Sequence, residues 1–129
     1  MLIADDEPHI RELMKVIVEA MDGFETVAEA SDGASAVELA KRLHPDMVLL
    51  DINMPELDGL EVLRQLKLID AEIDVLMLTS LNSIDVVRRA IQRGAKNYIL
   101  KDNKPEKIRN IIEQAGCERF DRLASAQPE

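Results

Sequence analysis

Five polar side chains in this sequence could together handle a phosphate group: Asp5, Asp6, Asp51, Thr79 and Lys101. Three carboxylates in one partly desolvated cleft repel one another strongly unless a cation lies among them. Because this set offers oxygen ligands, without Cys or His, it favours Mg²⁺. A carboxylate beside Mg²⁺ can attack phosphorus, while an ammonium and a hydroxyl stabilise charge on the phosphoryl oxygens. We therefore predict Asp51 as the nucleophile, assisted by Thr79 and Lys101.

Each of these side chains also has a simpler interpretation when taken alone. Asp5 or Asp6 can cap a helix, and Thr79 can cap another. Asp51 can start a turn, and Lys101 can be an exposed lysine at a strand end. The chemistry therefore depends on whether the fold brings these residues together.

Short apolar runs alternate with longer stretches of helical period, a pattern typical of a parallel sheet with helical crossovers. The pattern predicts strands buried on both faces at 2–4, 47–50, 75–78 and 98–100, and a more polar edge strand at 26–30. Between and after them come five amphipathic helices, whose apolar stripes begin at Ile10, Val37, Leu60, Ile84 and Ile108.

Five such units fit an α/β flavodoxin-like fold, a doubly wound (βα)5 with a five-stranded parallel sheet in the order 2-1-3-4-5. In this order the first and fourth strands flank the third, at a spacing of about 4.8 Å. The acidic pair and Thr79 should then lie within a few ångströms of Asp51. Lys101 must reach across two strand spacings, which its long stem allows.

Composition limits the partners of the chain. With 47% apolar and 32% charged residues in 129 positions, one globular domain is expected. The net charge of -9 opposes binding to nucleic acids and to anionic membranes, so proteins and cations are the expected partners. The single Cys117 and the distant His9 and His44 lack the spacing of a zinc site. Without a membrane span or signal peptide, we expect a cytoplasmic protein.

Four separate motifs resemble the receiver domain of two-component response regulators. They are ADDEP at 4–8, LLDINMPELDG at 49–59, LTS at 78–80 and YILK at 98–101. They occur in the family's order and extend over nearly the whole chain, which makes the signal specific.

The resemblance implies that a histidine kinase or phosphotransfer protein donates a phosphoryl group to Asp51. It also implies Mg²⁺ bound by Asp6, Asp51 and the backbone carbonyl of Asn53, and by Asp5 directly or through water. The chain would then be a phosphoacceptor and switch rather than an enzyme, although it would assist its own phosphorylation and dephosphorylation. Thr79 and Tyr98 would be the switch residues, with the tyrosine turning inward as the threonine moves toward the phosphate.

The switch would change the face formed by the fourth helix, the fifth strand and the fifth helix. Arg88, Arg89 and Arg93 lie there among acidic residues, so a downstream protein, a fused output domain or a phosphorylation-dependent homodimer could use this face. No basic, aromatic or helix-turn-helix segment predicts direct DNA binding by this chain.

Two local features depart from, or refine, the family pattern. Asp102 follows Lys101 where the family usually has proline, so we expect a trans peptide bond there. Leu81, two residues after Thr79, cannot hydrogen-bond an attacking water, and we therefore expect slow loss of the phosphoryl group.

The C-terminal stretch is longer than the fold needs. We expect a receiver domain at 1–116 and a C-terminal helical extension or linker at 117–129. Phe120 and Leu123 continue an apolar spacing that Gly116 interrupts, which fits a helix toward an output domain, a dimer contact or a frayed tail.

Two other functions are weighed against this hypothesis. A haloacid-dehalogenase-like phosphatase also uses an aspartate nucleophile and Mg²⁺, but it needs a second carboxylate where this chain has Asn53. A phosphate-independent scaffold with the same fold would more often lack one member of the acidic or phosphate-binding set. Binding of beryllofluoride, a phosphoryl mimic, would separate both from the main hypothesis.

Overall fold

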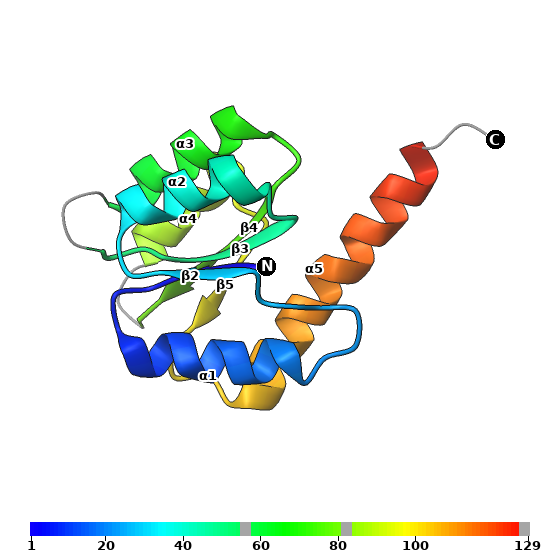
Figure 1. Cartoon of the computed structure of the whole chain (residues 1–129), viewed down its shortest axis with the longest axis horizontal. Helices are drawn as coiled ribbons and strands as arrows, with labels where there is room; N and C mark the ends of the chain where they lie inside the picture. The colour runs from blue at the N-terminus through cyan, green and yellow to red at the C-terminus, as the bar shows by residue number, and fades with distance from the viewer. Residues whose placement is uncertain (55–57, 81–83, 127–129) are drawn as a thin grey trace.

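The computed structural model describes residues 1–54, 58–80 and 84–126. Within these residues, strands β1 to β5 pair in parallel in the order β2-β1-β3-β4-β5, which confirms the predicted fold (Figure 1). The strands are β1 (Leu2–Ala4), β2 (Ala28–Ala30), β3 (Met47–Asp51), β4 (Asp74–Thr79) and β5 (Asn97–Leu100). The helices are α1 (Pro8–Glu19), α2 (Gly33–Leu43), α3 (Gly59–Ile69), α4 (Ile84–Gln92) and α5 (Pro105–Ala126).

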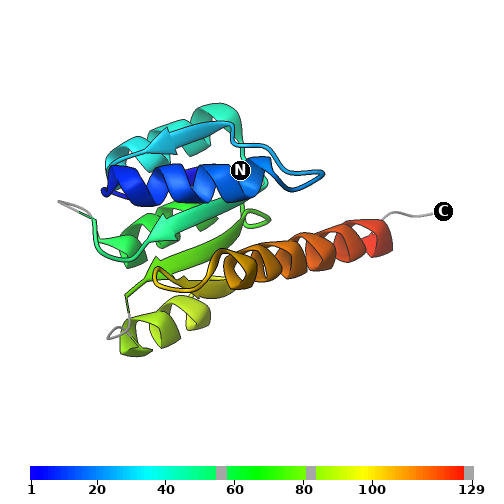
Figure 2. The same cartoon turned by 90° about the horizontal axis from the view of Figure 1, so that it is seen from below.

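The sheet is the middle layer of three. Helices α1 and α5 cover one face, and α2, α3 and α4 cover the other (Figures 1 and 2). Because side chains alternate along a strand, Val48 and Leu50 enter the core under α2, α3 and α4, whereas Leu49 enters the core under α1 and α5. The central strands are therefore buried on both faces, as their continuous apolar runs predict.

Local signals explain where several helices begin and end. Asp32 caps α2 by accepting a hydrogen bond from the Ser35 N–H, and Asp58 caps α3 through the Glu61 N–H. Gly94 has a positive φ of 107° shortly after α4, in the left-handed region where glycine ends helices without strain. These caps fix the direction in which each helix leaves the sheet.

The two edge strands differ in detail from the prediction. In β5 the Tyr98 side chain is exposed rather than buried, because β5 is an edge strand, and the strand begins one residue earlier, at Asn97. The edge strand β2 is confirmed but covers only residues 28–30.

Asp51 and Thr79 are the last residues of β3 and β4, so the backbone of each strand fixes the position of its side chain.

Helix α5 continues through Gly116 without a break and extends beyond the sheet (Figure 2). Gly116 is there because the ring of Phe24 packs against it: an added Cβ would lie 2.6 Å from the Phe24 Cζ. The apolar spacing is therefore interrupted to make room for a neighbour and not to end the helix. None of the described helices has the length and apolar character needed to cross a membrane.

Candidate functional site

The carboxyl ends of β1, β3, β4 and β5 bring the predicted residues to one edge of the sheet. In the register, Ala4 pairs with Leu50, and Asp51 pairs with Leu78. Asp5 and Asp6 follow β1, and Lys101 follows β5, with its N–H bonded to the Thr79 carbonyl at 2.8 Å. Neighbouring strand ends therefore supply every charged member of the predicted site.

Three carboxylates meet at this edge. One oxygen from each of Asp5, Asp6 and Asp51 lies within 4.8 Å of the others. Asp5 and Asp51 are fully buried, while Asp6 lies at the more accessible side of the group. Two buried carboxylates this close are unfavourable without a compensating cation.

Lys101 provides part of that compensation. Its Nζ lies 2.9 Å from Asp5 Oδ2, 3.1 Å from Asp51 Oδ2 and 3.6 Å from Glu7 Oε1. Its side chain is 13% exposed, so water screens these contacts little. The predicted reach of Lys101 over β4 to Asp51 is therefore observed.

The same carboxylates leave capacity for a metal ion. Asp51 Oδ1 accepts the Asn53 N–H and Asp5 Oδ1 accepts the Glu7 N–H. In contrast, the buried Oδ2 atoms of Asp5 and Asp51 accept no backbone N–H from the described residues, and both face the Lys101 ammonium. Buried oxygens of this kind, beside Asp6, fit a hard divalent cation such as Mg²⁺.

Burial and charge set the protonation of this cluster. Burial, and then the nearby charge of Asp5, raise the pKa of Asp51 from 3.8 to about 7, against the opposing effects of the Asn53 N–H and Lys101. Burial by itself would lower the pKa of Lys101, but the attraction of Asp5 and Asp51 outweighs it and the pKa is raised. The lysine therefore stays charged, while Asp51 binds a proton near neutral pH.

Gly59 allows helix α3 to start against the strand end that carries Asp51. Its N–H donates to the Ile52 carbonyl at 2.9 Å. An added Cβ would lie 2.7 Å from the Ile52 Cα and 2.8 Å from the Asp51 carbonyl oxygen, both backbone atoms that cannot yield cheaply. The Asp-Gly at 58–59 is therefore a packing requirement of the site as well as a helix cap.

Thr79 and Tyr98 line a cavity next to the acidic site. The Thr79 hydroxyl donates to the Ser80 carbonyl at 3.0 Å. Thr79, Tyr98, Ile84 and Val87 are among the residues lining a cavity of about 350 Å³ between α4 and β5. The Tyr98 side chain is 41% exposed and lies at the edge strand. The threonine and tyrosine thus share one space, as a switch between them would require.

Sequence reasoning missed two contributors. Arg11 donates from Nη1 to the Asp5 carbonyl at 2.7 Å, which ties α1 to the loop that carries the acidic pair. Glu7 is a further carboxylate beside Lys101. Glu7 lies in the ADDEP motif, so the sequence could have indicated it. The Arg11 contact depends on where α1 begins, which the motif does not define.

Of the two local features that depart from or refine the family pattern, the structure describes one. The Lys101–Asp102 peptide bond is trans, as expected, and the described residues contain no cis bond. Asn103 holds the turn there, since its side chain accepts the Leu100 N–H. Leu81 lies outside the described residues, as do residues 55–57 of the motif around Asp51.

The raised pKa of Asp51 predicts opposite effects of pH on the metal-free fold and on metal affinity. Between pH 4 and 7 the folded state holds a proton that the unfolded state has lost, so the free energy of unfolding falls as pH rises, by up to about 4 kcal/mol from this group. Mg²⁺ must displace that proton, so its affinity should fall up to about tenfold from pH 7 to pH 6. Urea unfolding and calorimetric titration measure these effects.

Asp51→Asn is the control for both measurements, because an amide does not titrate. The difference in unfolding free energy between wild type and variant should change between pH 5 and 7. A difference that stays constant over this range would show that Asp51 does not have the raised pKa.

Residues 1–113 match the family described as response regulator receiver domain. The chemotaxis protein CheY of Bacillus subtilis is 41% identical over 111 residues, which are 86% of this chain and 92% of that protein. The probable C4-dicarboxylate response regulator DctR of Priestia megaterium is 35% identical over 113 residues, or 88% of this chain. The chain spans about half the length of DctR.

Solved structures give the same result. The REC domain of AraT, a response regulator from Geobacillus stearothermophilus, is 31% identical with a TM-score of 0.81, covering 98% of this chain and 96% of that chain. A chain of the CheX-CheY-BeF3-Mg²⁺ complex from Borrelia burgdorferi is 30% identical with a TM-score of 0.82, covering 88% of this chain and 86% of that chain. That complex contains the phosphoryl mimic and the metal ion together.

Proposed function

Because the chain belongs to the receiver domains of response regulators, we propose that it accepts a phosphoryl group on Asp51 from a histidine kinase or phosphotransfer protein. One observation carries the proposal: the buried Asp51 lies among Asp5, Asp6 and Lys101, and its Oδ2 has the Lys101 ammonium as its ion-pair partner among the described residues. Such a group is costly to maintain in a core and suits a nucleophile that receives a charged substituent. Asp51 thereby acts as acceptor and the domain as a switch.

In the reaction, a carboxylate oxygen of Asp51 forms a bond to phosphorus as the phosphorus–nitrogen bond of the donor phosphohistidine breaks. The donor imidazole keeps the bonding electron pair. Lys101, already within 3.1 Å of Asp51, moves its ammonium onto a phosphoryl oxygen, and Thr79 donates its hydroxyl to another. Asp5 then loses part of its pairing with Lys101.

The residues fit Mg²⁺, which when bound neutralises charge on the phosphoryl oxygens. We assign its ligands to Asp6, Asp51 and the backbone carbonyl of Asn53, with Asp5 binding directly or through water. The Asn53 N–H already holds Asp51 Oδ1 at 3.1 Å, which orients the carboxylate and the loop that carries this carbonyl.

The signal leaves the site through Thr79 and Tyr98. To reach a phosphoryl oxygen, the Thr79 hydroxyl must give up its bond to the Ser80 carbonyl. This movement enlarges the cavity that Thr79 shares with Tyr98, and the exposed ring turns into it. The face formed by α4, β5 and α5 changes shape, and a downstream protein, an output domain or a second copy binds it in the phosphorylated state.

We propose residues 1–116 as the switch and residues 117–129 as the extension that leads away from it. The extension is part of the continuous helix α5, so a movement at the start of α5 can reach it.

Acetyl phosphate tests the acceptor function. With Mg²⁺, mass spectrometry should find one phosphoryl group per chain, and with EDTA none. Calorimetry should find that beryllofluoride binds only when Mg²⁺ is present. Mg²⁺-dependent labelling would support the proposal. No labelling together with no beryllofluoride binding would favour a phosphate-independent scaffold, and continuous release of inorganic phosphate from added phosphoesters would favour a phosphatase.

Thr79→Ala tests the switch. The variant should still accept phosphate, about tenfold more slowly, because one donor to the phosphoryl oxygens is lost. It should transmit the signal poorly, since a ligand shifts an equilibrium only through contacts that differ between the states. NMR shift changes on adding beryllofluoride and Mg²⁺ report this at Tyr98 and α4.

Thr79→Ser is the matched control, because it keeps the hydroxyl and removes only a methyl group. Its shifts should resemble those of the wild type. Changes at Tyr98 in Thr79→Ala as large as in the wild type would contradict the coupling.

A further inference from the structure

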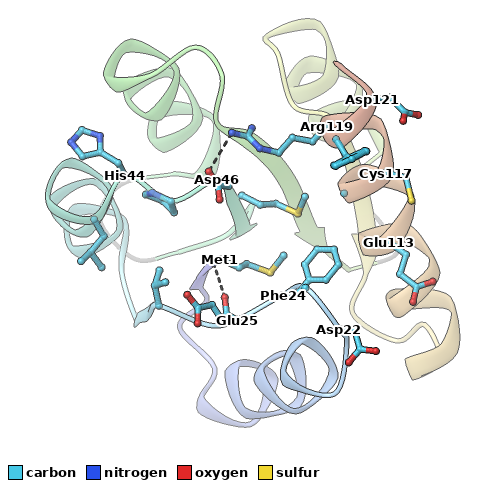
Figure 3. Close-up of a pocket in the computed structure, with 17 residues that line it drawn as sticks. Met1, Asp22, Phe24, Glu25, His44, Asp46, Glu113, Cys117, Arg119 and Asp121 are labelled. Carbon is cyan, nitrogen blue, oxygen red and sulfur yellow. Dashed lines mark hydrogen bonds and ion pairs between the residues drawn. The ribbon is translucent and has the colours of Figure 1, made fainter. Parts of the chain in front are cut away.

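A groove of about 960 Å³ opens at the amino ends of the strands, the opposite end of the sheet from Asp51 (Figure 3). Its walls are the loop after α1 at 22–27, the end of α2 with the loop at 43–47, and the second half of α5. These three segments are far apart in the sequence. The groove plays no part in the reaction proposed above.

The floor of the groove is apolar. Met1 and Met47 are buried at its base, and Phe24 packs against the core cluster that contains both; Figure 3 shows Phe24 beside Met1. Higher up, the side chains of Val27, Leu43 and Phe120 remain in contact with water, and Phe120 is 73% exposed. An aromatic ring and aliphatic groups gathered in one concave surface are typical of a binding site.

The α5 wall is fixed in place. Arg122 Nη2 lies 3.2 Å from Asp74 Oδ2, and Arg119 Nη1 lies 3.5 Å from the same oxygen. Arg119 also reaches Asp46 at 3.3 Å across the groove, as the dashed line in Figure 3 shows. Together with the Phe24 ring on Gly116, these contacts hold residues 116–122 of α5 against the amino ends of the strands. The groove is therefore preformed and does not depend on a loose helix end.

The rim of the groove is acidic. Five exposed carboxylates surround it: Asp22, Glu25, Asp46, Glu113 and Asp121. Among the described residues, Asp46 alone of the five forms an ion pair, with Arg119. The Met1 ammonium donates to the Glu25 carbonyl. The carboxylates of the other four residues are exposed to solvent.

The acidic rim favours a basic partner over a second copy of this chain. A second copy of a chain with net charge -9 would bring further negative charge to the rim, which is unfavourable. We propose that the groove binds a basic, amphipathic segment of another protein. An aromatic or aliphatic side chain of that segment enters between Phe24, Leu43 and Phe120, and its Lys or Arg residues pair with the free carboxylates. The binding is independent of the acceptor function of Asp51.

Selection from a random peptide library tests the proposal. The full chain is immobilised, bound peptides are enriched, and a synthetic copy of an enriched peptide is titrated by calorimetry. Enriched peptides should carry Lys or Arg around a bulky apolar residue. Phe120→Ser and Glu113→Lys/Asp121→Lys should each weaken binding about tenfold or more.

The control is Glu38→Lys/Glu106→Lys, which makes the same change in net charge at exposed positions outside the groove. It should alter the affinity by less than about twofold at 0.15 M salt, where distant charges are screened. All substituted positions are exposed, so thermal unfolding should confirm that each variant folds.

Three outcomes would overturn the proposal. Enrichment of peptides without basic residues would remove the charge argument. Equal weakening in the groove and control variants would show only general attraction to an acidic protein. A wild type that dimerises in sedimentation, with Phe120→Ser monomeric, would show that the occupant is a second copy.

Discussion

Replacing Asp51 with asparagine is expected to abolish phosphoryl transfer from acetyl phosphate. A carboxamide is not a competent nucleophile at neutral pH, and no bond to phosphorus can form at this position. The substitution is nearly isosteric, and the amide removes a like charge beside Asp5. We therefore expect Asp51→Asn to fold and to be at least as stable without metal as the wild type above pH 7.

The measurement is the fraction of chain that gains a phosphoryl group in the presence of Mg²⁺, followed over time by mass spectrometry. Asp102→Asn is the matched control, because Asp102 is exposed and follows Lys101 directly. It should label at the wild-type rate. Asp5→Asn should label more slowly without losing the acceptor. Labelling of Asp51→Asn to the wild-type extent would mean that the acceptor is another residue.

The sequence predicts well which edge of the sheet carries the candidate site, because strand order and strand ends determine it. Once the third strand lies between the first and fourth, Asp5 and Asp51 must come together, whatever the details of the loops. The burial of Asp5 follows from the same neighbours. The short apolar run around Tyr98 suggested burial on both faces, because a run alone does not distinguish an edge strand from a central one. The predicted order 2-1-3-4-5 already places the fifth strand at an edge, where one of its sides is less covered.

The groove at the other end of the sheet could not be predicted from the sequence. It requires Arg119 and Arg122 to reach Asp74, which is 45 and 48 residues earlier in the chain. Local periodicity carries no information about such pairs. The role of Gly116 was equally hidden, since only the position of Phe24 explains why α5 needs a residue without a side chain there.

Lys101→Met should destabilise the metal-free protein, bind Mg²⁺ more tightly and slow phosphorylation, and these effects together are the second largest that we expect. Without metal, the buried Asp5 and Asp51 lose the ammonium that lies within 3.1 Å of both, so the free energy of unfolding at pH 8 should fall by about 2–4 kcal/mol. Protonation of Asp51 relieves this cost, and the loss should therefore be smaller at pH 6.

The same substitution should increase the affinity for Mg²⁺. The ammonium lies beside the oxygens that would hold the ion and repels it, so the variant should bind Mg²⁺ more tightly and recover much of its stability when the ion is added. Phosphorylation should nevertheless slow by about 100-fold, because a cation that stabilises the phosphoryl oxygens is lost. Tighter metal binding with slower transfer separates the two roles of Lys101.

Lys107→Met serves as the control, since Lys107 is exposed on α5 and makes no ion pair within the described residues. Its unfolding free energy, Mg²⁺ affinity and labelling rate should match the wild type. If Lys101→Met instead binds Mg²⁺ more weakly, the lysine supports the metal site rather than competing with it. Transfer would then begin from a different arrangement, one in which Lys101 stays on Asp5 and orients that carboxylate for the ion.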